Sequence, residues 1–448
     1  MDRRLFLKSG LASLGYVASH QLMAQSLGLL SSISLQSGTA PTDYKTLVLV
    51  YLTGGLDSLG LIIPTNASEF NEYQKLRQHL AFTDSNLIDF GVSGYKVPSA
   101  CQSMANLYQA NKLAWVSNVG PLRQPTTKDM IQRNERAMPL FVGSHNSQMI
   151  LWQSGTMNPN ANEGWGARMI ELMNLNATAI TPNISLDGSQ LFTTTLNMQT
   201  FTVNRSGISN ISRIDGGEDQ TLFYALNNLP RNNVLDLELG KRNVNTLENS
   251  AYLKSVVDNI PEASVAYPGV SSWADDEIQQ QLKMAARLIE AAPTLGQHRQ
   301  VLMVQMHGYD THDNQDRDLP ALIQGLFSNL EAFQADLEQR GVDDRVVTFN
   351  QSDFGRTPTI NANGTDHGWG GHYFMMGTPV NGGQIVGQIP EFGLETNKML
   401  YNLTIPDYSV EQYASNLAKW FGLSAGEILD VFPTLSNFDD IDFGLLNS

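Results

Sequence analysis

The apolar residues of this chain fall into short, nearly continuous runs separated by helix-like segments. The clearest runs lie at residues 46–52, 112–120, 299–308, 343–355 and 372–377. They show little alternation with polar residues, which is typical of strands covered on both faces. Residues 275–292 and 319–341 instead have apolar positions at helical spacing, and the second segment ends on Gly341. The alternation of strand and helix predicts an α/β fold with a largely parallel central sheet flanked by helices.

One interval, at about residues 183–270, departs from this alternation. It is rich in Asn, Thr and Ser and has few long apolar runs. We interpret it as an irregular insertion or cap within one domain that spans residues 41–448.

The first residues have the pattern of an export signal. The sequence RRLFLK at residues 3–8 fits the twin-arginine motif, and a mildly apolar stretch follows at residues 11–30. Polar residues 19–21 interrupt this stretch, so it makes a poor membrane span. We therefore predict a twin-arginine signal peptide or leader over residues 1–40, export by the twin-arginine machinery, a periplasmic or secreted protein, and no stable membrane span.

Composition narrows the choice of partners and ligands. The formal net charge is −16 and the pI is about 4.9, which disfavours binding to nucleic acid. The single cysteine, Cys101, allows neither an internal disulfide nor a thiolate zinc cluster, and it fits a core position at the start of an amphipathic helix. A metal site in this chain must therefore use His, Asp, Glu or hydroxyl ligands.

Ionisable side chains gather at the ends of the predicted strands, which is where open α/β sheets bind ligands. The candidate metal ligands are Asp57, Asp310, His312, Asp353, His367 and His372. Imidazole and carboxylate without thiolate suit a divalent metal. Zinc fits best, and manganese, iron, magnesium and calcium are the alternatives. His307 lies in the same segment as Asp310.

A further candidate lies at the start of a predicted helix that runs to Gln153. Ser144 has the position of an N-cap, and a helix N-terminus stabilises anions. Ser144 or His145 would then face a phosphate-like group. The alternative is a plain capping serine.

Several of these segments together resemble a known family. The segments YLTGGLDSLGLIIP, SHNSQMILWQSG, GYDTHDNQ, QSDFGRTP and GTDHGWGGHYFMMG look like the landmarks of the bacterial domain of unknown function 1501 family. That family is exported, often by the twin-arginine route. It is grouped with the alkaline phosphatase and sulfatase superfamily, so the resemblance implies an alkaline-phosphatase-like α/β fold with a metal centre at the strand ends.

The resemblance also implies roles for individual residues. The places of the superfamily's site are taken by Asp57, the Ser144–His145 region, Asp310 with His312, Asp353 and His367. Phe354 stands where a histidine ligand of a second metal is expected. This leaves a single-metal centre, or a pair completed by His145 or His372. Cys101 is not followed by the x-Pro-x-Arg of formylglycine sulfatases, and no serine begins that motif, which argues against a conventional sulfatase.

The first functional hypothesis is an exported metal-dependent hydrolase of a phosphate, sulfate or related ester. Asp310, His312 and His367 would hold one ion. Asp57 and Asp353 would hold a second ion or orient the ligands of the first.

In this hypothesis Ser144 would be the nucleophile or an oxyanion donor, with His145 beside it, and Arg356 would clamp the anionic group of a small ester. The second hypothesis is a non-catalytic binding or assembly protein on a degenerate phosphatase-like fold, with a surface polymer or a protein as its partner. Phe354 at a ligand position favours this alternative.

Overall fold

The computed structural model describes most of the chain from residue 41 onward. The described residues are 41–173, 175, 180–198, 200–203, 207–208, 214, 216–439 and 441–447. The predicted twin-arginine leader, residues 1–40, lies outside them. In the described part of the chain, no helix combines the length and hydrophobicity that crossing a membrane requires.

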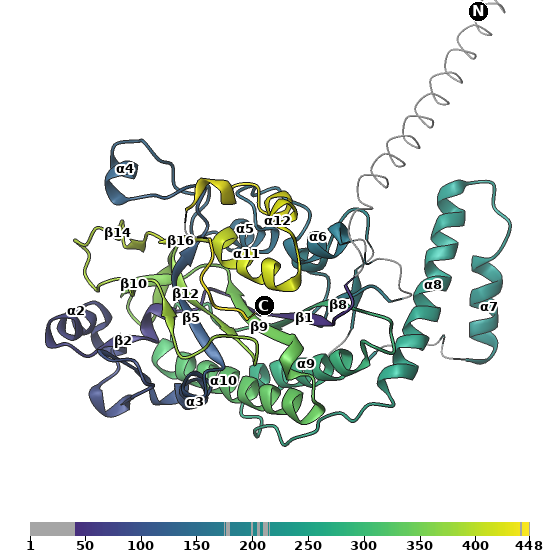
Figure 1. Ribbon diagram of the computed structural model, residues 1–448, viewed down its shortest axis with the longest axis horizontal. Coiled ribbons are helices and arrows are strands. Elements are labelled where there is room, and N and C mark those ends of the chain that lie inside the picture. The colour runs from purple at the N-terminus through teal and green to yellow at the C-terminus, as the bar shows by residue number, and fades with distance from the viewer. Residues whose placement is uncertain are drawn as a thin grey trace, which may run out of the picture.

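A nine-stranded sheet forms the centre of the fold (Figure 1). Its order is β13–β5–β12–β9–β1–β8–β6–β7, with β16 also paired to β5. The strands are β1 (Lys45–Leu52), β5 (Leu113–Gly120), β6 (Asn183–Ser185), β7 (Phe201–Thr202), β8 (Arg299–Met306), β9 (Val346–Ser352), β12 (Gly371–Met376), β13 (Ile385–Val386) and β16 (Tyr408–Ser409). β12 pairs antiparallel with β5 and β9, and the other pairings are parallel. The prediction of a largely parallel α/β sheet is confirmed.

The described residues form helices, several of which cover the two faces of this sheet. They are α2 (Ala67–Arg77), α3 (Gln102–Gln109), α4 (Lys128–Gln132), α5 (His145–Ser154), α6 (Trp165–Leu172), α7 (Gly217–Asn227), α8 (Val234–Val257), α9 (Trp273–Ala291), α10 (Gln315–Arg340), α11 (Val410–Phe421) and α12 (Ala425–Val431). Helices α3, α9 and α10 pack on one face, and α5, α6, α11 and α12 lie on the other (Figure 1). The predicted helices correspond to α9 and α10, and α10 ends at Gly341 in the left-handed conformation (φ 69°).

The central strands are apolar without alternation because the side chains of each strand pack into two cores, one on each face of the sheet. In β1, Val48 and Val50 belong to the core under α9 and α10, whereas Leu47 and Leu49 belong to the core under α6 and α11. All four are fully buried, and each such side chain stabilises the fold by roughly 1.5–3 kcal/mol. Cys101, directly before α3, is buried in the first core as predicted.

The interval 183–270 is more regular in its described part than its polar composition indicated. β6 and β7 extend the edge of the central sheet beside β8. Helices α7 and α8 project from the body of the molecule (Figure 1). α8 buries Leu247, Leu253 and Val257 on one face, and this spacing is the helical signal that the surrounding Asn and Glu residues obscured.

Short elements complete the fold and position the loops. Small sheets are formed by β2 (Ile63–Pro64), β3 (Leu87–Ile88) and β4 (Tyr95–Pro98), by β10 (Arg356–Ile360) and β11 (Thr365–His367), and by β14 (Met399–Leu400) and β15 (Leu403–Thr404). Single 3₁₀ turns lie at Ser58–Gly60, Gln78–Leu80, Asp84–Asn86, Ser99–Cys101, Leu191–Thr193, Asp343–Arg345 and Leu435–Asn437. Along the chain, the β10–β11 hairpin lies between β9 and β12. Its residues therefore lie near the edge of the sheet at which β9 ends.

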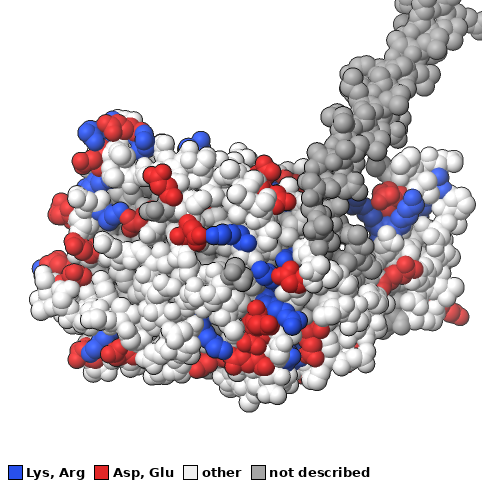
Figure 2. Space-filling model, viewed as in Figure 1, with Lys and Arg blue, Asp and Glu red and all other residues white. Residues whose placement is uncertain are grey.

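Charged side chains are dispersed over the surface. Figure 2 shows acidic and basic residues interspersed on the visible face, with no continuous basic area. On this face, acidic side chains are thus dispersed rather than gathered in one area.

The carboxyl ends of β1, β8 and β9 meet at one edge of the sheet because the three strands are parallel neighbours. Gly54 marks the closest approach there. It has φ +117°, and a Cβ atom at this position would lie 2.2 Å from the backbone N of Asp310. Glycine is therefore required for β1 and the loop after β8 to come together.

We predict that Gly54→Ala lowers the free energy of unfolding by about 3 kcal/mol or more, because it combines backbone strain with overpacking against a backbone. Gly188 is the matched control, since it also has positive φ (64°) but open space around its Cβ position. Gly188→Ala should cost only about 1 kcal/mol. Denaturant unfolding measures both variants, and equal losses would contradict the close-approach argument.

Candidate metal centre

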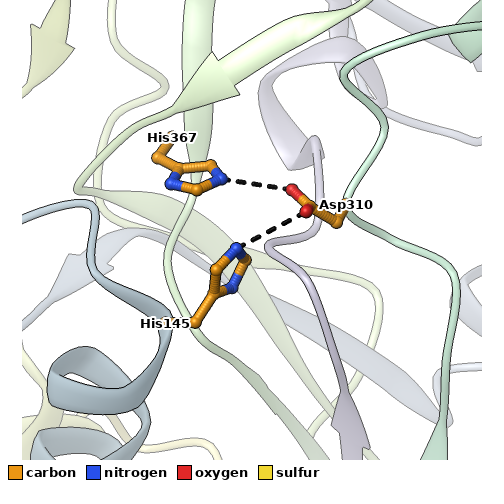
Figure 3. A group of neighbouring side chains, drawn as sticks. All are labelled: His145, Asp310 and His367. Carbon is orange, nitrogen blue, oxygen red and sulfur yellow. Dashed lines mark hydrogen bonds and ion pairs between the residues drawn. The ribbon is translucent and has the colours of Figure 1, made fainter.

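Three segments distant in sequence bring ionisable side chains together at this edge (Figure 3). The loop after β8 supplies Asp310, the β10–β11 hairpin supplies His367, and the first residue of α5 is His145. Potential ligand atoms of these three residues all lie within 4.8 Å of one another. The segments converge because β8 and β9 flank β1, while α5 packs beside β9.

The two imidazoles face different oxygens of one carboxylate (Figure 3). His367 Nε2 lies 3.2 Å from Asp310 Oδ1, and His145 Nε2 lies 3.5 Å from Asp310 Oδ2. The Asp310 side chain is 46% exposed, so a small solute can reach the group from solvent.

A backbone carbonyl fixes the tautomer of His367. Its Nδ1 lies 2.6 Å from the carbonyl oxygen of Gly143, which only accepts, so Nδ1 carries the proton and Nε2 presents its lone pair to the site. Gly143 has φ +80°, and a Cβ there would lie 3.2 Å from His367 Cβ. Burial lowers the pKa of His367, and the nearby His145 and Arg356 add to this effect, which favours the neutral, ligating form.

Asp353 fixes His145 in the same way. His145 Nδ1 lies 2.7 Å from Asp353 Oδ2, which also accepts from the N–H of Gly54 at 3.0 Å. The other oxygen of Asp353 accepts from the Tyr51 hydroxyl at 2.5 Å. Tyr51 remains a donor because burial, and next the Asp353 charge, raise its pKa well above the ordinary value. Asp353 thus holds His145 in place, as carboxylates behind metal-binding histidines commonly do.

Arg356 holds the carboxylate of Asp310. Its guanidinium is fully buried, and Nη1 donates to Asp310 Oδ1 at 2.8 Å and to the carbonyl of Gly54 at 2.9 Å. Nε and Nη2 donate to the Thr365 hydroxyl and carbonyl at 3.2 and 2.5 Å. Partial burial opposes ionisation of Asp310, but the hydrogen bond and charge of Arg356 outweigh it and lower the pKa of this carboxyl. Arg356 therefore faces inward to Asp310 rather than outward to an anion.

His312 lies at the open side of the group. Its Nε2 is 2.7 Å from His367 Nε2 and 3.1 Å from Asp310 Oδ1. Because His367 Nε2 accepts, the Nε2–H of His312 donates to it, and an ion held by His367 would replace this hydrogen bond. Asn361 Nδ2 lies 3.3 Å from His312 Nδ1. As oriented here, His312 directs a proton rather than a lone pair toward the site.

Phe354 forms an apolar wall behind the imidazoles. It is fully buried, with ring centroids 4.9 Å from His145 and 4.5 Å from His367. The side chain that stands at the expected second-metal position thus packs the histidines and offers no donor.

The remaining sequence candidates lie outside this group. Asp57 is buried in an ion pair with Arg77 at 2.5 and 2.7 Å and accepts from Gln315 Nε2 at 2.6 Å. His372 is buried on β12, where its Nδ1 accepts from the Asn118 N–H at 3.1 Å.

Ser144 caps α5 by position but makes no side-chain capping bond, and its hydroxyl lies 3.4 Å from that of Ser147. The structure therefore brings together Asp310, His312, Asp353, His367, His145 and Arg356, and not Asp57, His372 or the Ser144 hydroxyl.

Two supporting residues escaped the sequence analysis. Tyr51 carries the only hydroxyl of the apolar run VLVYL in β1, and this polar group in a buried strand was the signal available for it. Gly143 directly precedes the helix start, and its carbonyl role depends on the fold alone.

The donor set suits a borderline divalent metal. Two imidazole nitrogens and one carboxylate, with a position left for water or substrate, are typical of catalytic zinc sites. Both imidazoles have their outer nitrogen bound by a protein acceptor, which is the second layer that such sites need.

Comparison with known proteins identifies the family. The sequence profile described as "Protein of unknown function (DUF1501)" matches residues 44–428. The chain belongs to the DUF1501 family. No curated protein sequence is significantly similar to it.

Solved structures with a similar course of the chain have low identity to this DUF1501 protein. Ps i-CgsB in complex with k-i-k-neocarrahexaose has 10% identity and a TM-score of 0.38, covering 88% of this chain and 77% of that chain. Wild-type alkaline phosphatase PafA has 11% identity and a TM-score of 0.30, and the match covers 71% of this chain and 64% of that chain. The PsFucS1 sulfatase from Pseudoalteromonas sp. has 9% identity and a TM-score of 0.30, and the match covers 94% of this chain and 74% of that chain. Two of these structures are described as an alkaline phosphatase and a sulfatase, and the likeness says nothing about the activity of this chain.

We predict that Asp57→Asn lowers the free energy of unfolding by about 3–5 kcal/mol, because it leaves the buried Arg77 without its counter-charge. Metal content should not change. The exposed pair Lys96–Asp84 provides the control, and Asp84→Asn should cost less than about 1 kcal/mol. Denaturant unfolding and metal analysis measure the two effects, and loss of metal on Asp57→Asn would place Asp57 among the ligands after all.

His372 should make stability depend on pH. Burial lowers its pKa to about 4, against an opposing effect of Asp57, from an ordinary value of 6.5. Between these values the unfolded chain binds a proton that the folded chain does not, so stability falls as pH falls from 6.5 to 4, by up to about 1.4 kcal/mol per pH unit.

His372→Asn, which retains an acceptor for Asn118, should flatten the plot of unfolding free energy against pH in this window. His79→Asn, at an exposed histidine, should leave the slope unchanged. An equal slope in wild type and His372→Asn would contradict the prediction.

Proposed function

We propose that this DUF1501 protein is an exported, metal-dependent hydrolase of a small phosphate, sulfate or related ester. The observation that carries the proposal is the convergence of His145, Asp310 and His367, with the proton of each imidazole held on its far nitrogen. These three residues would hold one divalent ion, zinc by preference. When bound, such an ion polarises the ester oxygen and lowers the pKa of a bound water.

The charges around the site favour an anionic substrate once the ion is present. Asp310 and Asp353 together with Arg356 give the group a net charge of −1. A divalent cation changes this to +1, which attracts an anion even in an acidic protein. Because Arg356 is engaged with Asp310, the attraction comes from the loaded centre as a whole and not from an arginine clamp.

The arrangement favours water over Ser144 as the nucleophile. No contact in the described part of the structure joins the Ser144 hydroxyl to the three ligands, and its neighbour is Ser147. His312 is 40% exposed and has its Nε2 at the ligand group, so it can deliver or receive a proton there.

The convergence of His145, Asp310 and His367 also supports one alternative function, a non-catalytic protein that binds an anionic surface polymer or a partner. Because the Ser144 hydroxyl has no contact with the three ligands in the described part of the structure and Phe354 stands in place of a ligand, the site can hold an ion and an anion without turnover. The twin-arginine pattern at residues 3–8 supports a periplasmic or secreted location under either function.

We predict that Asp310→Asn abolishes metal binding at this centre and lowers turnover of an aryl phosphate or aryl sulfate to background. Asp353→Asn should retain the fold but weaken metal affinity by about 10–100-fold, because His145 loses the acceptor that orients it. Asp313→Asn, at an exposed carboxylate in the same loop, is the matched control and should behave as wild type. Elemental mass spectrometry and steady-state assays on metal-loaded protein give the readouts.

The outcomes separate the two functions. Bound metal with no turnover over a broad panel of esters would favour the binding protein. Wild-type protein that takes up no metal, or an unchanged number of bound metal equivalents in Asp310→Asn, would contradict the proposed centre.

A further inference from the structure

A second group of potential metal ligands lies on the other flank of β8. Asp187 follows β6, Glu277 is the fifth residue of α9, and His307 directly follows β8. Ligand atoms of all three lie within 4.8 Å of one another. His307 shares a loop with Asp310 but has none of the contacts described for the first centre.

The register of the fold places these residues together. Gln281 of α9 exchanges two hydrogen bonds, each 2.8 Å long, with the backbone of Gln305 in β8. Glu277 lies one helical turn before Gln281, about 6 Å along the helix. His307 lies two residues beyond Gln305, about 6.6 Å along the strand and on the same side. The two hydrogen bonds between Gln281 and Gln305 therefore place Glu277 at the same level as His307.

The neighbouring strand supplies the third group. β6 runs parallel to β8, with Ser185 opposite Met303. Two residues farther along, Asp187 reaches the level of Gln305 and contacts His307, with Oδ2 and Nε2 3.3 Å apart. Gln190 Nε2 donates to the Asp187 carbonyl at 2.9 Å, which holds this turn in place.

A buried amide adds a second observation. Gln305 is 6% exposed, and its Nε2 lies 3.3 Å from His307 Nε2. Its Oε1 is buried and has no hydrogen-bond partner within the described residues. Such an oxygen costs roughly 1–3 kcal/mol when it is left unsatisfied. Turning the amide by 180° places Oε1 at the end that faces His307 and Nε2 at the end without a partner.

We propose that Asp187, Glu277 and His307, with the Gln305 amide oxygen, form a second divalent cation site. Two carboxylates and one imidazole are side-chain types that bind divalent cations. One nitrogen and three oxygens suit Mn²⁺ or Zn²⁺. This site does not depend on the proposed hydrolase function.

The competing arrangement is a purely structural ion triad, in which a protonated His307 lies between the two carboxylates. It predicts no metal at this position. In that arrangement the turned Gln305 oxygen would accept from the protonated His307, so metal content distinguishes the two arrangements.

The experiment counts metal equivalents. Full-length protein is loaded with Mn²⁺ or with Zn²⁺ alone, desalted and measured by elemental mass spectrometry, with Mn²⁺ also followed by electron paramagnetic resonance. We expect Glu277→Gln and His307→Gln each to bind one equivalent less than wild type. Asp276→Asn, at the adjacent carboxylate on α9, should match wild type. Asp310→Asn should lose only the equivalent bound at the first centre.

The variants distinguish failure of one site from failure of the other. If the first centre is empty, wild type binds one equivalent, which Glu277→Gln removes and Asp310→Asn retains. Unchanged stoichiometry in folded His307→Gln or Glu277→Gln overturns the second site, as does wild-type protein without metal. If the buried Glu277→Gln variant fails to fold by circular dichroism, Asp187→Asn at the half-buried carboxylate provides the same decision.

Discussion

The buried guanidinium of Arg356 is the interaction on which the arrangement of the first centre depends. It joins the end of β1 through the Gly54 carbonyl, the loop after β8 through Asp310, and β11 through Thr365. A buried arginine is tolerated only when its donors are satisfied and its charge is paired. Meeting that requirement fixes Asp310 as an ionised acceptor and closes the hairpin that carries His367. The positions of two candidate ligands thus follow from the burial of one cation.

Much of the architecture was predictable from the sequence because the parallel strands are apolar on both faces and because such strands place their carboxyl ends at one edge. The segments that meet there were correctly identified, and Asp310, His312 and His367 do lie together. The sequence could not show which of these polar side chains would form an ion pair or hydrogen bond with a residue of a neighbouring element. Asp57 has the expected place after β1, yet Arg77 on α2 pairs with it. No local pattern announces such a partner, since it depends on how α2 packs against the end of the sheet.

The role of Asp353 also depends on partners that the sequence does not reveal. Its place after β9 predicted a ligand, whereas in the structure its two oxygens accept from Tyr51, Gly54 and His145. A carboxylate with those partners orients an imidazole more effectively than it binds an ion. His145, expected from sequence as a neighbour of the nucleophile or a substitute ligand, thereby gains a ligand's geometry. Phe354 is consistent with this arrangement, because a ring packed against two imidazoles restricts their rotation.

The two candidate cation sites follow from the central place of β8 in the sheet. β8 has β1 on one side and β6 on the other, so the loop after it can serve the ends of both neighbours. Gly308, with φ +109°, changes the direction of the backbone immediately after His307. His307 therefore stays beside Asp187 at the end of β6, whereas Tyr309 donates its N–H to Thr53 and leads Asp310 to the end of β1. A substitution that stiffens residue 308 would disturb both groups at once, since one glycine separates the residue that faces β6 from the residues that face β1.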